Sequence, residues 1–175
     1  MGGDCYGFSL TAANNLLVTM YNDKQIKEFT PDGQLIREIS LDISIQSPWH
    51  SVQYSDDLIV VSDNGGPRNE IHQVCMIDMN GRITRSYCGR RGSGVKQLNN
   101  PHDIQVNTHG HILVSDINNY RVVLLNDTFT HLGCIPVPGV KRSFTMRLDE
   151  QNKRLYSAGG TGHIYVLGVD NPIMH

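Results

Sequence analysis

The sequence predicts an all-β protein built as a β-propeller of four-stranded antiparallel blades, with about four blades in its 175 residues. Three observations support this prediction: a turn-rich composition, short aliphatic runs that follow turns, and the return of these runs at a regular spacing. Glycine occurs 17 times, and charged residues make up only 18% of the chain. Such a composition favours short strands over long helices.

Short aliphatic runs that follow polar turns form the first set of expected strands, at residues 16–19, 58–63, 111–116 and 154–158. A second run follows each of them after a few residues, at 25–29, 73–77, 121–125 and 163–167. Turns come next, and Gly33 and Gly81 in two of these turns suit the positive φ that a tight connection needs. Beyond the turn lies a further strand-like stretch, so each repeat is a series of short strands.

The spacing of the runs is regular across the chain. Phe29 and Leu125 are 96 residues apart, as are Leu10 and Val106, whereas Leu125 and Leu167 are 42 residues apart. Four units of about 43 residues, each with four short strands, are typical of propeller blades. A β-sandwich would also have regular strands, but it would not repeat its loop motifs at a fixed period.

We therefore expect one propeller segment over residues 1–175. Its blades are expected at approximately 5–41, 42–89, 90–133 and 134–168, with a C-terminal tail at 169–175. An insertion at 65–69 accounts for the greater length of the second unit.

The third unit carries the most specific motif. It reads GRRGSGVKQLNNPHDIQVNTHGHILVSDINNYRVVLLND over residues 89–127. This stretch resembles an NHL repeat, and the second unit keeps Pro48 and Asp63 of the pattern, whereas the first has Met20 and the fourth has Ala158 in place of the aspartate. Together the units resemble the NHL propellers at the C-terminal end of tripartite-motif proteins. The resemblance implies part of a six-bladed ring.

Five residues of the repeat motif are interpreted as structural: Pro48, Asp63, Pro101, Asp116 and Arg121. Asp116 ends one strand and Arg121 begins the next, five residues later. A carboxylate and a guanidinium at this spacing can close the loop through a charge-assisted hydrogen bond, and the guanidinium can also bond loop carbonyls. We expect the pair to support the scaffold.

The charge distribution indicates a binding surface. No acidic residue lies between Asp78 and Asp103, although five cations do. Propeller topology brings some of them to one face, called the top face here, together with loops of other repeats. The candidate binding residues on this face are Arg68, His72, Arg90, Arg91, Lys96, Asn118, Asn119 and Tyr120. Such a surface suits an acidic protein or single-stranded RNA. The alternative is a solvated polar rim, because exposed Lys and Arg usually have no partner.

Two classes of function follow. The first is a recognition module that is not an enzyme, and the NHL resemblance implies the substrate-recognition part of a ubiquitin ligase whose RING is not in this chain. The second is a propeller enzyme of the amidoglycolate lyase or lactonase-like hydrolase type, with a metal in the central channel. The eight histidines show no ligand spacing typical of a metal site, so we expect neither metal nor cofactor. The only tryptophan, Trp49, is either a wedge between blades or an exposed anchor.

The remaining expectations concern location and assembly. The sequence has neither an apolar run long enough for a membrane span nor a visible signal peptide. Its four scattered cysteines are typical of a reducing compartment, and we expect a cytoplasmic protein with no membrane partner. Blades needed to close the ring would come from the rest of a longer chain or from self-association.

Overall fold

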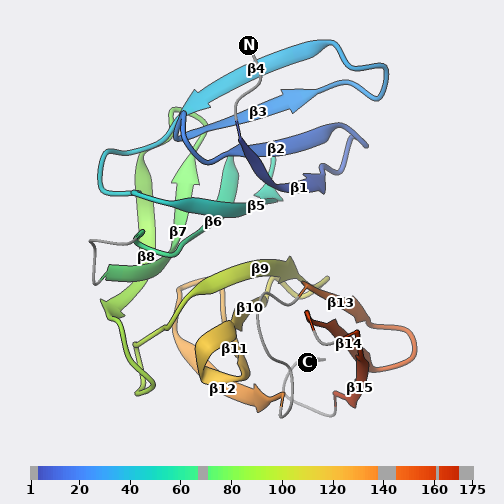
Figure 1. Ribbon diagram of the computed structural model, residues 1–175. Coiled ribbons are helices and arrows are strands. Elements are labelled where there is room, and N and C mark those ends of the chain that lie inside the picture. Colours follow the sequence, from blue (N-terminus) through green and yellow to red (C-terminus); the bar gives the residue numbers. More distant parts are fainter. Residues whose placement is uncertain (1–3, 67–70, 138–144, 161, 170–175) are drawn as a thin grey trace.

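A computed structural model describes residues 4–66, 71–137, 145–160 and 162–169. It confirms an all-β fold: the strands form separate antiparallel sheets, which follow one another as the blades of a four-blade β-propeller. In Figure 1 the sheets are arranged in an arc, with an opening between the first and the last. In the described ranges no helix has the length and apolar character needed to cross a membrane.

The bounds of the strands are as follows. Blade 1 contains β1 (Cys5–Leu10), β2 (Leu16–Met20), β3 (Gln25–Phe29) and β4 (Leu35–Ser40). Blade 2 contains β5 (Pro48–Ser55), β6 (Leu58–Asp63), β7 (Ile71–Asp78) and β8 (Ile83–Arg90). Blade 3 contains β9 (Pro101–Val106), β10 (Ile112–Asp116), β11 (Arg121–Leu125) and β12 (His131–Pro136), with a short 3-10 turn, η1 (Ile117–Asn119), between β10 and β11.

Blade 4 contains β13 (Thr145–Asp149), β14 (Arg154–Ala158) and β15 (Ile164–Gly168), so the part of this blade that the structure describes has three strands. In every blade the strands lie in chain order and pair antiparallel. The first strands, β1, β5, β9 and β13, are the inner strands of the arc, and each contacts the next.

Three hydrophobic cores hold the blades together, one at each junction. Between blades 1 and 2, Leu17 and Ile26 pack with Ile59 and Val61. The second core, between blades 2 and 3, includes Val60, Val74, Ile104 and Val114, and the third joins blade 3 to blade 4. Because side chains of a strand alternate between its two faces, each central blade contributes one face to each of two cores.

The inner strands of blades 1 and 2 approach closely at Gly7. A Cβ atom on this glycine would lie 2.5 Å from the carbonyl oxygen of Trp49 and 2.7 Å from Cδ2 of His50. A larger residue would therefore push the two strands apart. Gly7 is needed here for close backbone approach and not for an unusual φ.

Candidate functional site

The inner strands of all four blades surround a central cavity with a volume of about 780 Å³. Its wall on blade 1 is mainly apolar and includes Phe8 and Leu10. On blades 2 and 3 the glutamine side chains of Gln53 and Gln105 contribute polar groups, and blade 4 contributes Arg147. A cavity of this size and mixed lining suits a ligand with both apolar and hydrogen-bonding parts.

Aromatic rings form one part of the cavity wall. The rings of Trp49 and His102 have centroids 3.9 Å apart, and Tyr6 lies edge-on to Trp49 at 4.5 Å. Trp49 therefore packs among rings from blades 1 and 3 while still lining the cavity. His102 is buried, and burial lowers its pKa to about 3. The imidazole is neutral at neutral pH.

A second histidine, His50, ties three inner strands together. Its Nδ1 accepts the backbone N–H of Ile104 in blade 3 at 3.1 Å, and its Nε2 lies 3.2 Å from the carbonyl oxygen of Phe8 in blade 1. With Nδ1 accepting, Nε2 carries the proton and donates it to Phe8. Nδ1 also lies 3.1 Å from Oδ1 of Asp103, but one nitrogen cannot accept from the amide and donate to the carboxylate. The hydrogen bond from the Ile104 N–H makes Nδ1 the acceptor.

Asp103 connects the inner strands of blades 3 and 4 in a similar way. Its Oδ2 accepts the backbone N–H of Met146 at 2.7 Å and the hydroxyl of Thr145 at 2.9 Å. Both Asp103 and His50 thus hold neighbouring inner strands. Within the described ranges, no group of three or more His, Cys, Asp or Glu residues is placed to hold a metal ion.

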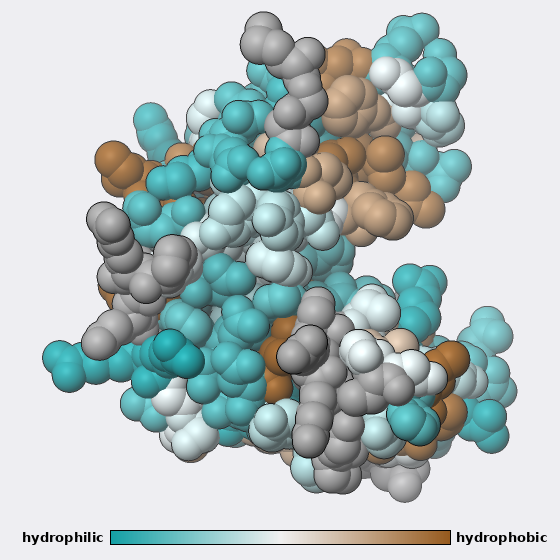
Figure 2. Space-filling view, viewed as in Figure 1, coloured by the Kyte–Doolittle hydropathy of each residue, from teal (hydrophilic) through white to brown (hydrophobic). Residues whose placement is uncertain are grey.

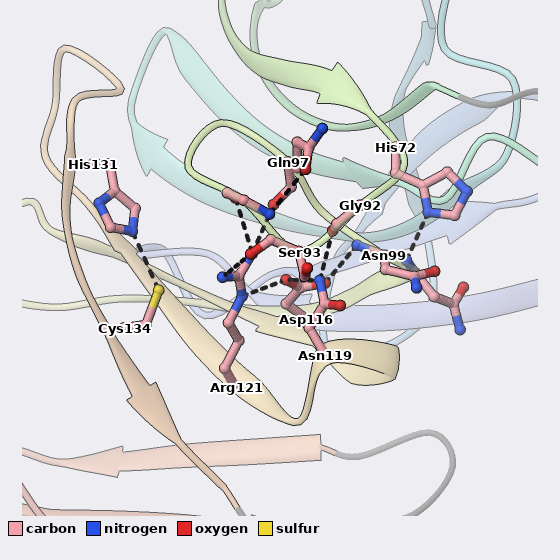
Figure 3. A network of polar contacts seen from close by, with 12 residues as sticks. His72, Gly92, Ser93, Gln97, Asn99, Asp116, Asn119, Arg121, His131 and Cys134 are labelled. Carbon is pink, nitrogen blue, oxygen red and sulfur yellow. Dashed lines mark hydrogen bonds and ion pairs between the residues drawn. The ribbon is translucent and has the colours of Figure 1, made fainter.

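The top face carries a second polar site, centred on Asp116 (Figure 3). This carboxylate is fully buried; its Oδ1 accepts the backbone N–H of Asn99 at 2.6 Å, and its Oδ2 accepts Nδ2 of Asn119 and Nε of Arg121, each at 2.7 Å. Burial raises the pKa of Asp116, although these hydrogen bonds and the guanidinium charge oppose that shift. Arg121 also donates to the carbonyl of Gln97 at 2.8 Å.

Asp63 occupies the corresponding place in blade 2. It is paired with Pro48 across β5 and β6, as Asp116 is paired with Pro101 across β9 and β10. Its Oδ1 accepts the backbone N–H of Ser47 at 2.8 Å, and its Oδ2 accepts Nε2 of Gln73 at 2.9 Å. The backbone N–H groups of Gln46 and Gly65 donate to the same carboxylate.

Three of the predicted top-face residues, His72, Arg91 and Asn118, line one pocket of about 310 Å³. Nδ1 of His72 accepts the backbone N–H of Asn100 at 2.6 Å, and Nε of Arg91 donates to Oδ1 of Asn99 at 2.9 Å. Burial, and next the charge of Arg91, lower the pKa of His72. The sequence did not indicate the other lining residues, Tyr21, Asn64, Gly66 and Asn100, which come from loops of three repeats.

The other predicted binding residues lie elsewhere. Arg90, Lys96 and Tyr120 are exposed and do not line this pocket. Asn119 is half-buried and is bonded to Asp116. Arg68 lies outside the described residues.

Comparison with known proteins supports the fold and leaves the family open. No protein-family model and no curated protein matches the chain. Among solved structures, virginiamycin B lyase from Staphylococcus aureus is 16% identical with a TM-score of 0.58, and the match covers 97% of this chain and 57% of the lyase. A structure of streptogramin B lyase is 15% identical with a TM-score of 0.57, over 97% of this chain and 56% of that one.

A computationally designed protein, Ika4, is 12% identical with a TM-score of 0.60, and here the match covers 97% of this chain and 94% of the designed chain. The identities are low, so these likenesses show the propeller fold alone. The chain spans little more than half the length of the two lyases.

The expectation that the chain is not an enzyme is wrong, because the solved propellers similar to it include lyases. The absence of metal-ligand spacing in the sequence does not exclude catalysis, because function on a propeller depends on its inner strands and loops.

Proposed function

We propose that the chain binds a ligand in its central cavity as part of a lyase-type propeller. The observation that carries this proposal is the convergence of all four inner strands on one cavity of about 780 Å³. The cavity combines aromatic and aliphatic side chains with a few polar ones, which is the usual character of a small-molecule site. The likeness to two lyases supports the reaction class.

The cavity wall suggests the kind of ligand. Trp49 and Val106 offer apolar contact on blades 2 and 3, while Gln53, Gln105 and Arg147 can bond carbonyl or carboxylate groups. A peptide-like molecule with hydrophobic side chains matches both. One solved structure of the Staphylococcus aureus lyase is that of an inactive variant with quinupristin. Quinupristin is therefore a suitable first probe.

The described cavity residues divide into two roles. His50 and Asp103 are bonded to neighbouring inner strands, so we assign them to positioning the wall. His102 and Arg147 line the cavity from blades 3 and 4 and are assigned to ligand contact. The neutral imidazole of His102 can exchange hydrogen bonds with an uncharged ligand, whereas Arg147 attracts a carbonyl or carboxylate oxygen.

Fluorescence of Trp49 provides the test, because it is the only tryptophan and lines the cavity. Addition of quinupristin should change its emission in a saturable manner, and mass spectrometry of the same mixture reports any bond cleavage. Arg147→Ala should weaken binding at least tenfold, while Arg154→Ala on the adjacent strand should not. Unchanged emission together with intact quinupristin would exclude quinupristin as a ligand. Equal effects of the two variants on binding would exclude Arg147 as a ligand contact.

A second candidate function is supported by the top-face pocket. Its described lining residues include Arg91, the imidazole of His72 and several amides, and none of them carries a carboxylate. These groups suit an anionic partner, and the NHL resemblance of the third repeat favours a protein or single-stranded RNA. Binding of a short single-stranded RNA and of an acidic peptide should both be measured across salt concentrations.

The contrast between Arg91 and Arg90 tests this second candidate. Arg91 lines the pocket and Arg90 does not, although both are exposed and adjacent. Arg91→Ala should weaken binding of whichever probe binds and should flatten its salt dependence, while Arg90→Ala should have the smaller effect. If both variants bind as the unmodified protein does, the pocket is not the contact surface.

A further inference from the structure

The two ends of the arc present apolar surface. On the outer side of blade 1, the leading face consists of Phe8, Leu10, Leu16 and Val18; Phe8 is 70% exposed and Leu10 is 64% exposed, whereas Leu16 is half-buried and Val18 is buried. On the outer side of blade 4, the trailing face includes Ile164 and Val166, which are 71% and 53% exposed. Figure 2 shows hydrophobic surface on both sides of the opening between the two ends of the arc.

The leading face has buried counterparts inside the molecule. The residues 96 positions further along the chain are Ile104, Val106, Ile112 and Val114. The strand registers agree, since Phe8 pairs with Val18 in blade 1 as Ile104 pairs with Val114 in blade 3. Ile104, Ile112 and Val114 are buried in the core between blades 2 and 3, and Val106 is partly buried and packs against that core. The leading face therefore has the character of a face that packs against a preceding blade.

The trailing face has buried counterparts too. Ile164 and Val166 lie 42 positions after Val122 and Leu124. Those two residues are 0% and 2% exposed, and both lie in the core between blades 3 and 4. The trailing face therefore has the character of a face that packs against a following blade.

The two ends are thus the two halves of a junction that the chain forms three times internally. We propose that the leading face of one copy packs against the trailing face of a second copy of this chain. A second copy is the occupant that these observations favour, because it presents the matching half at each end. The contact is head-to-tail, so two copies form a closed pair with both junctions made if the rotation between them permits, and a longer series otherwise.

The first measurement is the mass of the 175-residue chain in solution by light scattering, over a wide range of concentration. One copy has a mass of 19.6 kDa, and the proposal expects a species of twice that mass or more as concentration rises. A chain that stays at the mass of one copy throughout would overturn the proposal.

Two charge substitutions then test which surfaces meet. Leu10→Asp on the leading face and Val166→Lys on the trailing face should each reduce the assembly to single copies, because each places a charge in an apolar junction. Ile43→Asp is the matched control, because Ile43 is 86% exposed and belongs to neither face. It should assemble as the unmodified chain does.

Mixing the two variants distinguishes head-to-tail pairing from other arrangements. A mixture of Leu10→Asp and Val166→Lys copies should assemble again, because one junction then joins opposite charges and the other is unmodified. If either variant alone keeps the assembly, or the mixture stays as single copies, the proposal fails. Thermal melting checks folding, and Phe8→Gln serves as a milder leading-face variant if Leu10→Asp melts early.

Discussion

Asp63 and Asp116 stand at the same place in successive blades, and both are fully buried, yet their partners differ. Asp116 is neutralised by the guanidinium of Arg121, with Asn119 and one backbone N–H beside it. Among the residues that the structure describes, no cation bonds to Asp63; its carboxylate accepts bonds from backbone N–H groups and from the amide of Gln73.

The comparison teaches that the aspartate, and not the ion pair, is the common element. In both blades the carboxylate joins the end of the second strand to the loop that enters the blade, through Ser47 in blade 2 and Asn99 in blade 3. A buried carboxylate needs several donors, and backbone groups can supply them as well as a cation can. In blade 3 each partner of the ion pair depends on the other, because removing either one leaves an unpaired charge.

The largest expected effect is that of Asp116→Ala. It leaves Arg121 without its counter-charge and Asn99 without an acceptor, and we expect a loss of about 3 kcal/mol in the free energy of unfolding. Urea denaturation measures it. Asp127→Ala, in an exposed turn of the same blade, is the control and should change the stability by less than about 0.5 kcal/mol.

Asp63→Ala should cost less, about 2 kcal/mol, because the partners that it leaves without an acceptor in the described ranges are amide groups and not a cation. The same denaturation experiment, on the same day and buffer, compares it with Asp116→Ala. A greater loss at Asp63 than at Asp116 would show that charge pairing does not explain the difference between the two blades.

Arg121→Gln tests whether a glutamine can replace the arginine as the partner of the aspartate in blade 3, as Gln73 does in blade 2. The glutamine amide can still donate to Asp116, but the bonds to the carbonyls of Ser93 and Gln97 are lost. We expect a loss of about 1–2 kcal/mol. Arg121→Ala should be the more harmful variant, and equal losses for the two would contradict the view that an amide can stand in for the guanidinium.

The smallest expected effect concerns His72 of blade 2, which accepts the backbone N–H of Asn100 at the entry to blade 3 and so connects the two blades. Its pKa is lowered in the folded protein, chiefly by burial, so the unfolded chain takes up the proton first. The stability it contributes is present above its ordinary pKa of about 6.5 and is lost as the pH falls from that value through the lower pKa of the folded protein.

His72→Gln keeps an acceptor for Asn100 but cannot be protonated. The melting temperature should therefore fall less between about pH 7 and pH 5 in the variant than in the unmodified protein. A decrease of the same size in both would exclude His72 as a source. His102, whose pKa is lowered in the same direction, keeps its contribution in both proteins.

The repeats made the fold predictable. Offsets such as the 96 residues between Leu10 and Val106 can be measured from the sequence alone. The strand registers place these two residues at matching positions in blades 1 and 3. The more detailed resemblance to NHL propellers was less informative, because the solved structures similar to this chain include lyases with the same architecture.

The candidate sites were only partly predictable, because they form where distant segments meet. Arg91 stands in a cationic stretch and could be singled out, but its neighbours Tyr21 and Asn64 belong to other repeats and have no local signal. The central cavity likewise exists only once four inner strands converge. Gln73 replaces the arginine of the motif, and only the structure pairs its amide with Asp63.

The position of His50 has a consequence for how the molecule opens. One imidazole in blade 2 bonds the backbone of blades 1 and 3, so blade 2 cannot detach without breaking contacts of both neighbours. Repeat proteins usually lose structure unit by unit from their ends. Here amide hydrogens of β5 and β9 should exchange late and together, and a fragment cut between them should not keep the protection of either half.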